Sequence, residues 1–382
     1  MLYIGVDLGT SAVKLLLMDE SGKVLNIVSK EYPISFPKPG WSEQNPCDWW
    51  EQTVAGLIEL TKDFDRSVVA GISFGGQMHG LVVLDENDNV IRPAILWNDG
   101  RTQKETDYLN NVIGKEKLSE LTGNIAFAGF TAPKILWLKA NEPENFARIK
   151  KLMLPKDYIA YRMTGVFSTD YSDASGMLLL DVKNKCWSKE MLDICDVREE
   201  WLPGLYESSE KTGTLKADVA CELGFPKDCI VAAGAGDNAA AAIGTGTVGA
   251  GKCNLSLGTS GTLFITSDEF RVDSHNALHS FDHADGGKVV KFLALVYNPD
   301  KLRKGVMVPG RFAMTCCIED VTFIGFKCKY EDESSIPHKS WITITARVHV
   351  EFAREYKGKG PVLYPVSIEP AEKPQDELVY FS

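Results

Sequence analysis

The chain has 382 residues, of which 44% are hydrophobic and 24% charged, and its formal net charge at pH 7 is −11. This composition is typical of a globular protein that is long enough for two or three domains. The negative charge argues against a nucleic-acid partner or an anionic membrane surface, because no basic excess is available to neutralise phosphates. A small neutral substrate fits this charge better.

We expect neither export nor insertion into a membrane. The first residues alternate as a strand and lack a basic region followed by an apolar core, so no signal peptide is expected. No apolar run approaches the roughly 20 residues that span a bilayer. Nine cysteines, an odd number without a C-x-x-C pair, indicate reduced thiols. The sequence therefore predicts a cytoplasmic protein.

The stretch around which the chain is organised is Gly5 to Lys14. Alternating apolar residues predict a strand that ends near Leu8, a turn at Gly9 to Ser11, and a returning strand from Val13. A glycine lets backbone N–H groups approach a ligand closely, and the turn's hydroxyls add donors toward phosphate oxygens. Asp7 at the mouth of this turn can hold Mg²⁺.

The alternative interpretation of this stretch is an ordinary hairpin with a polar turn. A second turn of the same kind, Leu257 to Gly261, favours the phosphate interpretation. Two such turns that face each other can clamp one polyphosphate.

Strands and helices alternate along the chain up to about residue 266, which predicts a mixed α/β fold. The predicted elements are a strand at 24–32, an amphipathic helix that begins at Pro46 with Asn45 as its cap, short strands at 68–72, 81–84 and 93–96, mostly helix over 102–165, a short helix at 216–223, a buried strand at 230–233, a helix from Ala239, and strands at 253–257 and 262–266.

Polar side chains follow two of these strands. Gln77, Met78 and His79 offer an amide, an apolar wall and an imidazole, a set that suits a polyol, although a lone loop histidine is more often structural. Trp97, Asn98, Asp99 and Arg101 combine an aromatic plate with a carboxylate and a guanidinium, as sugar sites commonly do.

Asp237 lies where a buried strand ends and an alanine-rich helix begins. Gly234 and Gly236 keep side chains away from it, so a ligand can come close. A carboxylate at this edge can accept a hydroxyl proton while the hydroxyl attacks phosphorus. The alternative is that Asp237 only caps the helix.

Two groups of residues raise the question of a metal site. The helical spacing of His275, His279 and His283 can suggest a metal, but no acidic pattern lies between them. Cys316 and Cys317, with Cys328 and His349 downstream, are better explained as structural thiols, because adjacent residues of a strand point to opposite faces.

Residues 1 to about 288 resemble the carbohydrate kinases that include glycerol, gluconate and xylulose kinases, and the bacterial xylulose kinases in particular. The strings that carry the resemblance, in chain order, are GVDLGTSAVK, WSEQNPCDWW, GGQMHG, RPAILWNDGR, GFTAPKILWL, LPKDYIAYRMTG, DYSDASG, GAGDNAAAAIGTG, LSLGTSG and HSFDHA.

The resemblance implies an actin- or hexokinase-like fold of two lobes, with the sugar and ATP between them. It assigns Asp237 as the catalytic base and Asp7 as the Mg²⁺ residue. It implies a first phosphate loop of Gly9, Thr10, Ser11 and Lys14 together with Asp7, and a second of Gly258, Thr259 and Ser260. The sugar contacts implied are Met78 and His79, with Gln77, Trp97, Asp99, Arg101 and Asn238 nearby, and the string QMH favours D-xylulose or a similar ketopentose.

The sequence departs from this family after about residue 288. We expect a kinase lobe over 1–245, the truncated start of a second lobe over 246–288, and a β-rich, OB-like module over 289–382 with strands at 292–296, 311–315, 321–326, 341–350 and 360–368. This last segment resembles the soluble C-terminal domain of an uncharacterised, permease-associated bacterial family. It is either a genuine fusion or the product of a rearrangement or assembly error.

Three functions are compatible with these features. The first is ATP- and Mg²⁺-dependent phosphorylation of D-xylulose at its terminal hydroxyl, impaired by the loss of most of the second lobe. The second is a sugar-binding remnant that cannot position ATP. The third assigns the function to the C-terminal module. The sequence is also compatible with a homodimer, in which a second copy of the chain is the partner.

Overall fold

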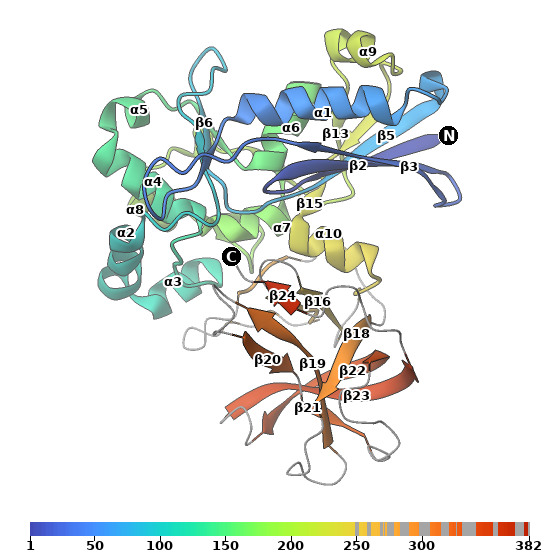
Figure 1. Ribbon diagram of the computed structural model, residues 1–382. Coiled ribbons are helices and arrows are strands. Elements are labelled where there is room, and N and C mark those ends of the chain that lie inside the picture. Colours follow the sequence, from blue (N-terminus) through green and yellow to red (C-terminus); the bar gives the residue numbers. More distant parts are fainter. Residues whose placement is uncertain are drawn as a thin grey trace. The chain divides into compact units, whose positions relative to one another are not determined.

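The computed structural model describes residues 1–248, 252–257, 261–267, 270, 272, 279–282, 290–297, 306–314, 321–325, 327–330, 341–353, 358–370 and 378–380. Contacts divide the chain into two compact units (Figure 1). The first unit holds Met1–Ala240 and Phe270–Ala284, and the second holds Ala241–Glu269 and Asp285–Ser382. The boundaries expected at residues 245 and 288 stay a prediction.

A twisted mixed sheet forms the centre of the first unit. The order of its strands is β13-β14-β5-β1-β2-β3, and β15 also pairs with β5. The strands are β1 (Leu2–Leu8), β2 (Ala12–Asp19), β3 (Val24–Glu31), β5 (Val69–Gly76), β13 (Lys211–Thr214), β14 (Ile230–Ala232) and β15 (Ala235–Gly236). Strands β1, β14 and β15 run parallel to β5, whereas β2 is antiparallel to both β1 and β3. The mixed α/β fold class is thus confirmed.

The predicted hairpin at the N-terminus is confirmed, and so is the first helix. Asn45 caps α1 (Pro46–Leu60), because its side chain accepts a hydrogen bond from the Cys47 N–H. Strand β5, in contrast, continues to Gly76, four residues beyond its predicted end. The strand ends in Gly75 and Gly76, and the absence of a side chain lets other elements pack closely against it. A Cβ on Gly76 would lie only 3.0 Å from the Cβ of Lys156.

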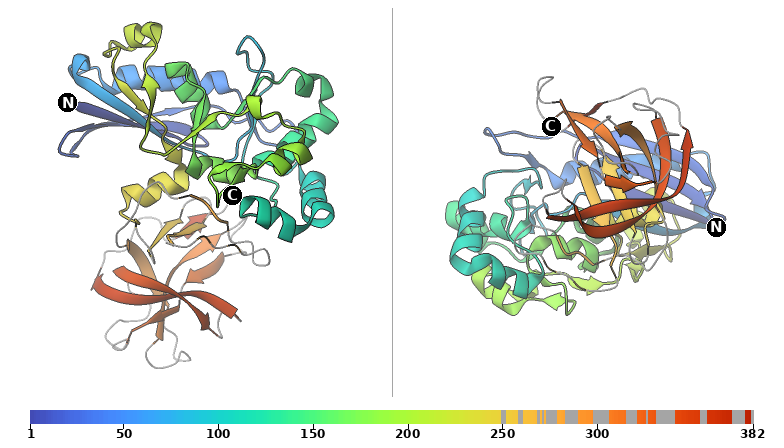
Figure 2. Two further views of the ribbon diagram at one scale, coloured as in Figure 1. Left: turned by 180° about the vertical axis from the view of Figure 1, so that it is seen from behind. Right: turned by 90° about the horizontal axis from the view of Figure 1, so that it is seen from below.

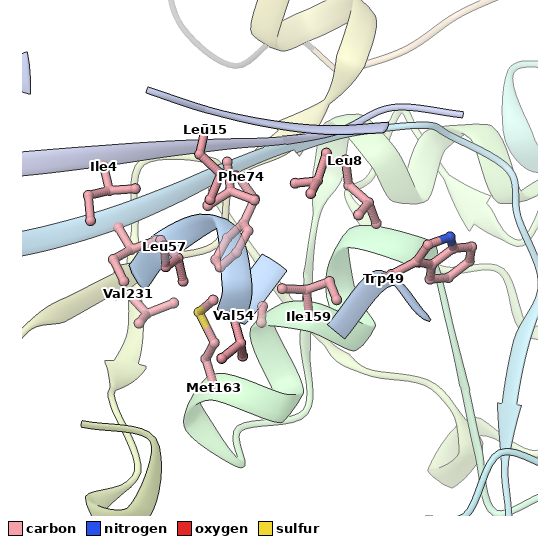
Figure 3. Close-up of a cluster of buried hydrophobic side chains, with 14 of the residues drawn as sticks. Ile4, Leu8, Leu15, Trp49, Val54, Leu57, Phe74, Ile159, Met163 and Val231 are labelled. Atoms are coloured by element: carbon pink, nitrogen blue, oxygen red, sulfur yellow. The ribbon is translucent and has the colours of Figure 1, made fainter. Parts of the chain in front are cut away.

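Helix α1 contacts α6 (Pro155–Thr164) and α9 (Ala217–Leu223), and both α1 and α6 contact the central sheet. Apolar side chains of the sheet and of these helices build the first core, part of which Figure 3 shows. Leu15, Leu57 and Trp49 are fully buried in this core. Burial of this apolar surface, at about 25 cal/mol per Å², is the main term that holds the sheet and the helices together.

A mostly helical region with its own core completes the first unit. Its helices are α2 (Gln103–Tyr108), the π-helix Leu109–Gly114, α3 (Lys115–Thr122), α4 (Thr131–Asn141), α5 (Pro143–Ala147), α7 (Tyr171–Ala174) and α8 (Lys189–Cys195), with short 3₁₀ turns at Arg66–Val68, Ser175–Met177 and Glu199–Trp201. Short paired strands connect these helices: β4 (Glu43–Gln44) with β7 (Ala94–Ile95), β6 (Val82–Leu84) with β8 (Lys151–Met153), β9 (Ser168–Asp170) with β12 (Gly204–Tyr206), and β10 (Leu180–Asp181) with β11 (Cys186–Trp187). The mostly helical character predicted for 102–165 is confirmed.

Helix α10 (Asp237–Gly244) begins directly after β15 ends. It starts in the first unit and ends in the second.

The second unit contains a hairpin of β16 (Cys253–Leu257) and β17 (Gly261–Ile265), and a separate seven-stranded sheet. This sheet consists of β18 (Val290–Tyr297), β19 (Val306–Met314), β20 (Val321–Gly325), β21 (Lys327–Lys329), β22 (Trp341–Ala353), β23 (Gly358–Pro370) and β24 (Leu378–Tyr380). Its pairing path β18-β22-β23-β21-β19 returns to β18, so the sheet closes into a barrel (Figure 2). The strands predicted for this segment are confirmed.

Candidate active site

The hydroxyl-rich turn at the N-terminus lies between β1 and β2, with Asp7 paired to Lys14 across the hairpin. The Gly9 N–H donates to the carbonyl of Ala12 over 3.1 Å, which closes the turn. A Cβ on Gly9 would lie 3.0 Å from that same carbonyl oxygen, so the tight turn favours glycine. The predicted turn is confirmed, while the binding of phosphate by Gly9, Thr10, Ser11 and Lys14 stays a prediction.

Two of the residues expected near the sugar, Trp97 and Gln77, donate hydrogen bonds to this turn. Trp97 donates its indole N–H to the Thr10 hydroxyl over 2.9 Å. Gln77 is 2% exposed and donates its amide to the carbonyl of Gly9 over 3.4 Å. A direct contact of either residue with a sugar stays a prediction.

Sequence reasoning missed two further residues of this support. Gln44 donates to the carbonyl of Thr10 over 2.7 Å and accepts from Trp49 and Gln77, so one buried amide connects three segments. Tyr32 donates its hydroxyl to the carbonyl of Gly9. Gln44 belongs to the polar run Ser42 to Asn45 before α1, which was the only signal for it in the sequence. A pattern of polar and apolar residues does not tell which polar side chains of such a run point into the interior.

Asp99 and Arg101 pair with each other in the interior. The carboxylate of Asp99 accepts from the Arg101 guanidinium over 2.9 and 2.7 Å and from the Ser42 N–H over 2.6 Å. The Arg101 side chain is 1% exposed, and its guanidinium lies over the Trp41 ring at 3.7 Å and 2.7 Å from Glu43. Both side chains are therefore occupied by protein partners, and their contact with a sugar stays a prediction.

The loop that follows β5 brings Met78 next to Asn238. The Asn238 amide lies 3.7 Å from the sulfur of Met78, and a Cβ on Gly236 would lie 2.9 Å from that sulfur. A larger residue in place of Gly236 would therefore clash with the Met78 thioether, which packs against the Gly236 backbone. Of the residues that the sequence assigned to the sugar, Met78 and Asn238 are in contact here, with His79 next to Met78 in the chain, and their binding of a sugar stays a prediction.

His79 has a left-handed backbone with φ of 69°, which is uncommon for a residue with a side chain. Its carbonyl accepts hydrogen bonds from the ammonium of Lys134 over 2.8 Å and from the Thr131 hydroxyl over 3.1 Å. These contacts hold the loop in its strained conformation. Lys134 is fully buried, and burial lowers its pKa to about 7.

The protonation state of His79 follows from its partners. Burial, with a smaller contribution from the nearby Lys134 ammonium, lowers its pKa to about 3, so the ring is neutral at physiological pH. Nδ1 lies 2.8 Å from the carbonyl oxygen of Gly176, which can only accept. Nδ1 therefore carries the proton, and Nε2 is an acceptor suited to a hydroxyl group.

Asp7 and Asp237 lie at the same edge of the central sheet. Asp7 stands opposite Gly75 in the β1–β5 ladder, and Ala235 stands opposite the same glycine in the β15–β5 ladder. Two ladder spacings of about 4.8 Å separate these two strands. Asp237 follows β15 directly, so both carboxylates lie at the carboxyl ends of parallel strands. The strand between them, β5, ends in Gly75 and Gly76, which have no side chains to separate the two carboxylates.

Both carboxylates are accessible to solvent, yet protein surrounds them closely. Burial raises the pKa of Asp7, and the Lys14 ammonium opposes this rise. Burial also raises the pKa of Asp237 to about 6; the Asn238 N–H opposes that rise and the negative charge of Asp7 adds to it. The exposed surface decides whether a ligand can reach these groups, and the surrounding protein decides the direction of their pKa.

This donor set fits a divalent cation. Mg²⁺ prefers oxygen ligands, and a cation near Asp7 and Asp237 relieves the repulsion between the two carboxylates. The second turn expected at phosphate, Gly258, Thr259 and Ser260, lies outside the described residues. Among the described residues, no group of three or more His, Cys, Asp or Glu side chains is arranged to hold a metal ion. Of the spaced histidines, His275 and His283 lie outside the described residues, as do Cys316 and Cys317.

A second group of carboxylates lies behind the first, and sequence reasoning missed it. Lys156 is fully buried, with its ammonium 2.7 Å from Asp157, 2.9 Å from Asp170 and 3.5 Å from Asp173. The Ser172 hydroxyl accepts from the Gly236 N–H over 3.1 Å, which connects this cluster to the residue before Asp237. The cluster fixes the end of β15 from the inside.

The fold and these two accessible carboxylates define a kinase-like protein of the actin and hexokinase type. Residues 2–244 match the FGGY family of carbohydrate kinases, N-terminal domain, and the chain belongs to this family. Residues 251–381 match the DUF1980 C-terminal domain. Both resemblances noted in the sequence are confirmed.

Among curated proteins, the chain is 46% identical to a xylulose kinase of Escherichia coli over 283 residues, which are 74% of this chain and 58% of that protein. It is 46% identical to a xylulose kinase of Lactococcus lactis over 74% of this chain and 57% of that protein. A solved kinase structure from Brucella ovis, described as a xyloylose kinase, shares 43% identity and a TM-score of 0.71 over 74% of this chain and 58% of that chain.

The chain spans less than two thirds of the length of the curated relatives it matches. The alignments cover 74% of this chain, so they continue past residue 251 into the segment that also matches the DUF1980 domain.

Proposed function

We propose that the chain phosphorylates D-xylulose, or a similar ketopentose, at its terminal hydroxyl with MgATP, and that it does so slowly. The observation that carries this proposal is the position of Asp237. Its carboxylate is accessible, follows a parallel strand, and accepts a hydrogen bond from the N–H of Asn238, whose side-chain amide contacts the Met78 sulfur. With its pKa raised to about 6, it is ionised at neutral pH and basic enough to accept a proton.

Each side chain has a task in this reaction. His79 orients the sugar by accepting a hydrogen bond from a sugar hydroxyl group at Nε2, and Met78 provides the apolar face. Asp237 accepts the proton of the terminal hydroxyl as the hydroxyl attacks phosphorus. When bound, MgATP supplies the phosphoryl group and neutralises part of its charge. Asp7 is the residue that would hold the metal, and the turn at Gly9 to Ser11 would contact the phosphates.

The low rate follows from residues 251–381. Phosphoryl transfer depends mainly on the positioning and electrostatic stabilisation of the transferring group, and closure around the substrates completes such a site. In this chain the segment that follows the matched kinase domain corresponds to a different domain. Contacts to the adenine and a closing lobe are therefore expected to be lost, which lowers kcat and not only the affinity for ATP.

The test is ADP release by purified, monodisperse protein with D-xylulose and MgATP. We expect a turnover orders of magnitude below the enzyme median of about ten per second. A turnover near that median would contradict the proposed impairment and imply that the second unit rebuilds a nucleotide site. No turnover above the background without enzyme would favour the second candidate.

That second candidate is a protein that binds the sugar without phosphorylating it. It is favoured by the same replacement of the second lobe, because the sugar-facing residues Met78, His79 and Asn238 all precede residue 245. Under both candidates D-xylulose raises the melting temperature by binding the native state, and glycerol does so far less. Equal shifts for the two ligands, or none with D-xylulose, would remove the basis for a ketopentose.

A cytoplasmic location and a homodimer belong to this proposal as well. Within the described residues, no helix has the length and apolar character needed to cross a membrane.

A further inference from the structure

A short segment beyond the matched kinase domain returns to the first unit. Residues 270–284 belong to the first unit, although the residues before and after them belong to the second. The side chain of Asn124, which is 2% exposed, donates to the carbonyl of Ser280 and accepts from the Ser280 N–H, both over 2.9 Å. The Asp282 N–H donates to the Ser175 hydroxyl over 3.1 Å. These bonds fix the position of residues 279–282 along the surface.

The rings of this segment join an aromatic cluster that reaches the sugar loop. His279 lies 4.7 Å from Phe127, 5.0 Å from Phe130 and 5.5 Å from Phe281, measured between ring centres. Phe130 stacks on His79 at 4.6 Å, and Phe281 lies 6.2 Å from His79. The imidazole expected to contact the sugar is therefore bordered by a ring from the returning segment.

Packing alone explains part of this arrangement, since Phe281 contacts the second hydrophobic core. It does not explain why the rings keep open surface: His279 is exposed and Phe281 is only half-buried. Open aromatic faces beside the neutral imidazole of His79 are chemistry that a polyol can use, through its C–H faces and its hydroxyl groups.

We propose that residues 279–282 form the outer wall of the sugar site, and that the Phe281 ring favours a five-carbon sugar over shorter polyols. This inference rests on the proposed function, because it takes His79 as a sugar contact. A three-carbon polyol held near Asp237 covers only the inner part of the site. A longer carbon chain extends along His79 toward Phe281 and gains apolar contact there.

The experiment uses the full chain and compares Phe281→Ala with the matched control Phe270→Ala. Phe270 belongs to the same returning segment, but its ring lies over Gly123, where a Cβ would be 3.1 Å from it. We expect Phe281→Ala to weaken D-xylulose binding about threefold to tenfold in calorimetry, in line with the loss of one aromatic contact. Glycerol binding, and D-xylulose binding by the Phe270→Ala variant, should change less than twofold.

Amide hydrogen exchange adds a measurement whose result would not depend on the ligand if Phe281 had only a structural role. D-xylulose should slow exchange at the amides of Phe281 and Asp282 in the wild-type chain, and glycerol should not. If Phe281→Ala lowers the melting temperature of the free protein, Phe281→Leu keeps apolar volume for packing but removes the ring, and the loss of affinity should persist.

The outcomes separate this inference from the proposed function. If the wild-type chain does not bind D-xylulose, the proposed function is wrong. If the wild-type chain binds and the Phe281 variants bind equally well, without protection of residues 281 and 282, the outer wall is wrong while the proposed function stands.

Discussion

The first unit contains two groups of aspartates that lie close together but in opposite surroundings. Asp7 and Asp237 keep accessible surface, whereas Asp157, Asp170 and Asp173 are at most 2% exposed around one lysine. The positive charge that lowers the pKa of Asp7 is that of Lys14, which faces Asp7 across the hairpin and is itself exposed. The same residue type is thus found in two settings: at an accessible edge where a ligand can reach it, the place of the proposed chemistry, and in the interior where it supports the structure.

The buried group also shows how the accessible one is positioned. Lys156 is on α6, Asp170 ends β9 and Asp173 is on α7, so one ammonium ties three elements together. Asp170 in turn accepts from the Ser172 and Ser208 hydroxyls. Since Ser172 also accepts from the N–H of Gly236, the backbone before Asp237 is fixed by this internal network.

The largest effect is expected from Asp237→Asn, which tests the accessible group. The amide has the same size and can still begin α10, but it cannot accept a proton. Any phosphoryl transfer should fall about 10²- to 10⁴-fold, as measured by ADP release. D-xylulose binding should persist in calorimetry. A variant with wild-type turnover would show that Asp237 is not the base.

The pH dependence of the wild-type chain sharpens the same point. The pKa of Asp237 is raised to about 6, so the base is protonated and inactive below that pH. We expect kcat/KM to fall as pH drops through about 6, and to show no such step from His79, whose pKa of about 3 keeps it neutral throughout. A kcat/KM that stays constant down to pH 5 would contradict this assignment.

The next effect concerns the buried group. Lys156→Met removes the single ammonium among three buried carboxylates, and breaking a buried pair in this way costs about 3–5 kcal/mol of unfolding free energy. Urea unfolding measures this loss. Lys117→Met is the matched control, since it removes an exposed ion pair with Glu190 and should change the unfolding free energy little. Equal stability of the two variants would mean that the cluster is not held by Lys156.

Local features of the first unit could be predicted from the sequence, because their causes are local. Alternation of apolar residues is enough for β1 and β2, and Asn45 before a proline is enough for the start of α1. The barrel strands were predicted in the same way. The glycine-ended strand β5 was missed in its last residues, because its extension depends on how closely α6 approaches.

The resemblance assigned residues to the site, and this assignment stays a prediction, whereas the contacts of these residues could not be predicted from the sequence. Gln77 reaches Gly9 across 68 positions and Trp97 reaches Thr10 across 87, distances over which no pattern in one sequence carries information. Lys156 looked like any charged residue at the start of a helix, because charge does not reveal burial. The resemblance to kinases identified Asp7 and Asp237, whereas the support behind them required the fold.

The smallest expected effect separates the members of the buried group. Neither oxygen of Asp173 has a hydrogen-bond partner among the described residues, although the Lys156 ammonium lies 3.5 Å away. Asp157 and Asp170, in contrast, accept from backbone or hydroxyl donors. Burial raises the pKa of Asp173 well above its usual value, and the ammonium does not offset this. We therefore expect Asp173 to keep its proton in the folded chain to a higher pH than an exposed aspartate does.

Asp173→Asn should then be tolerated, and its effect should depend on pH in a defined direction. A raised folded pKa means that the native state binds this proton more tightly than the unfolded chain, so stability is greatest below the unfolded value of about 4 and falls as pH rises toward the folded value. Asparagine cannot ionise in the folded or the unfolded state, so the variant lacks this decrease of stability with rising pH. Unfolding in urea at pH 4.5 and pH 8 should give similar stabilities for wild type and variant at the lower pH, and a more stable variant at the higher one. A variant that is less stable at pH 8 would mean that Asp173 is ionised and pairs with Lys156.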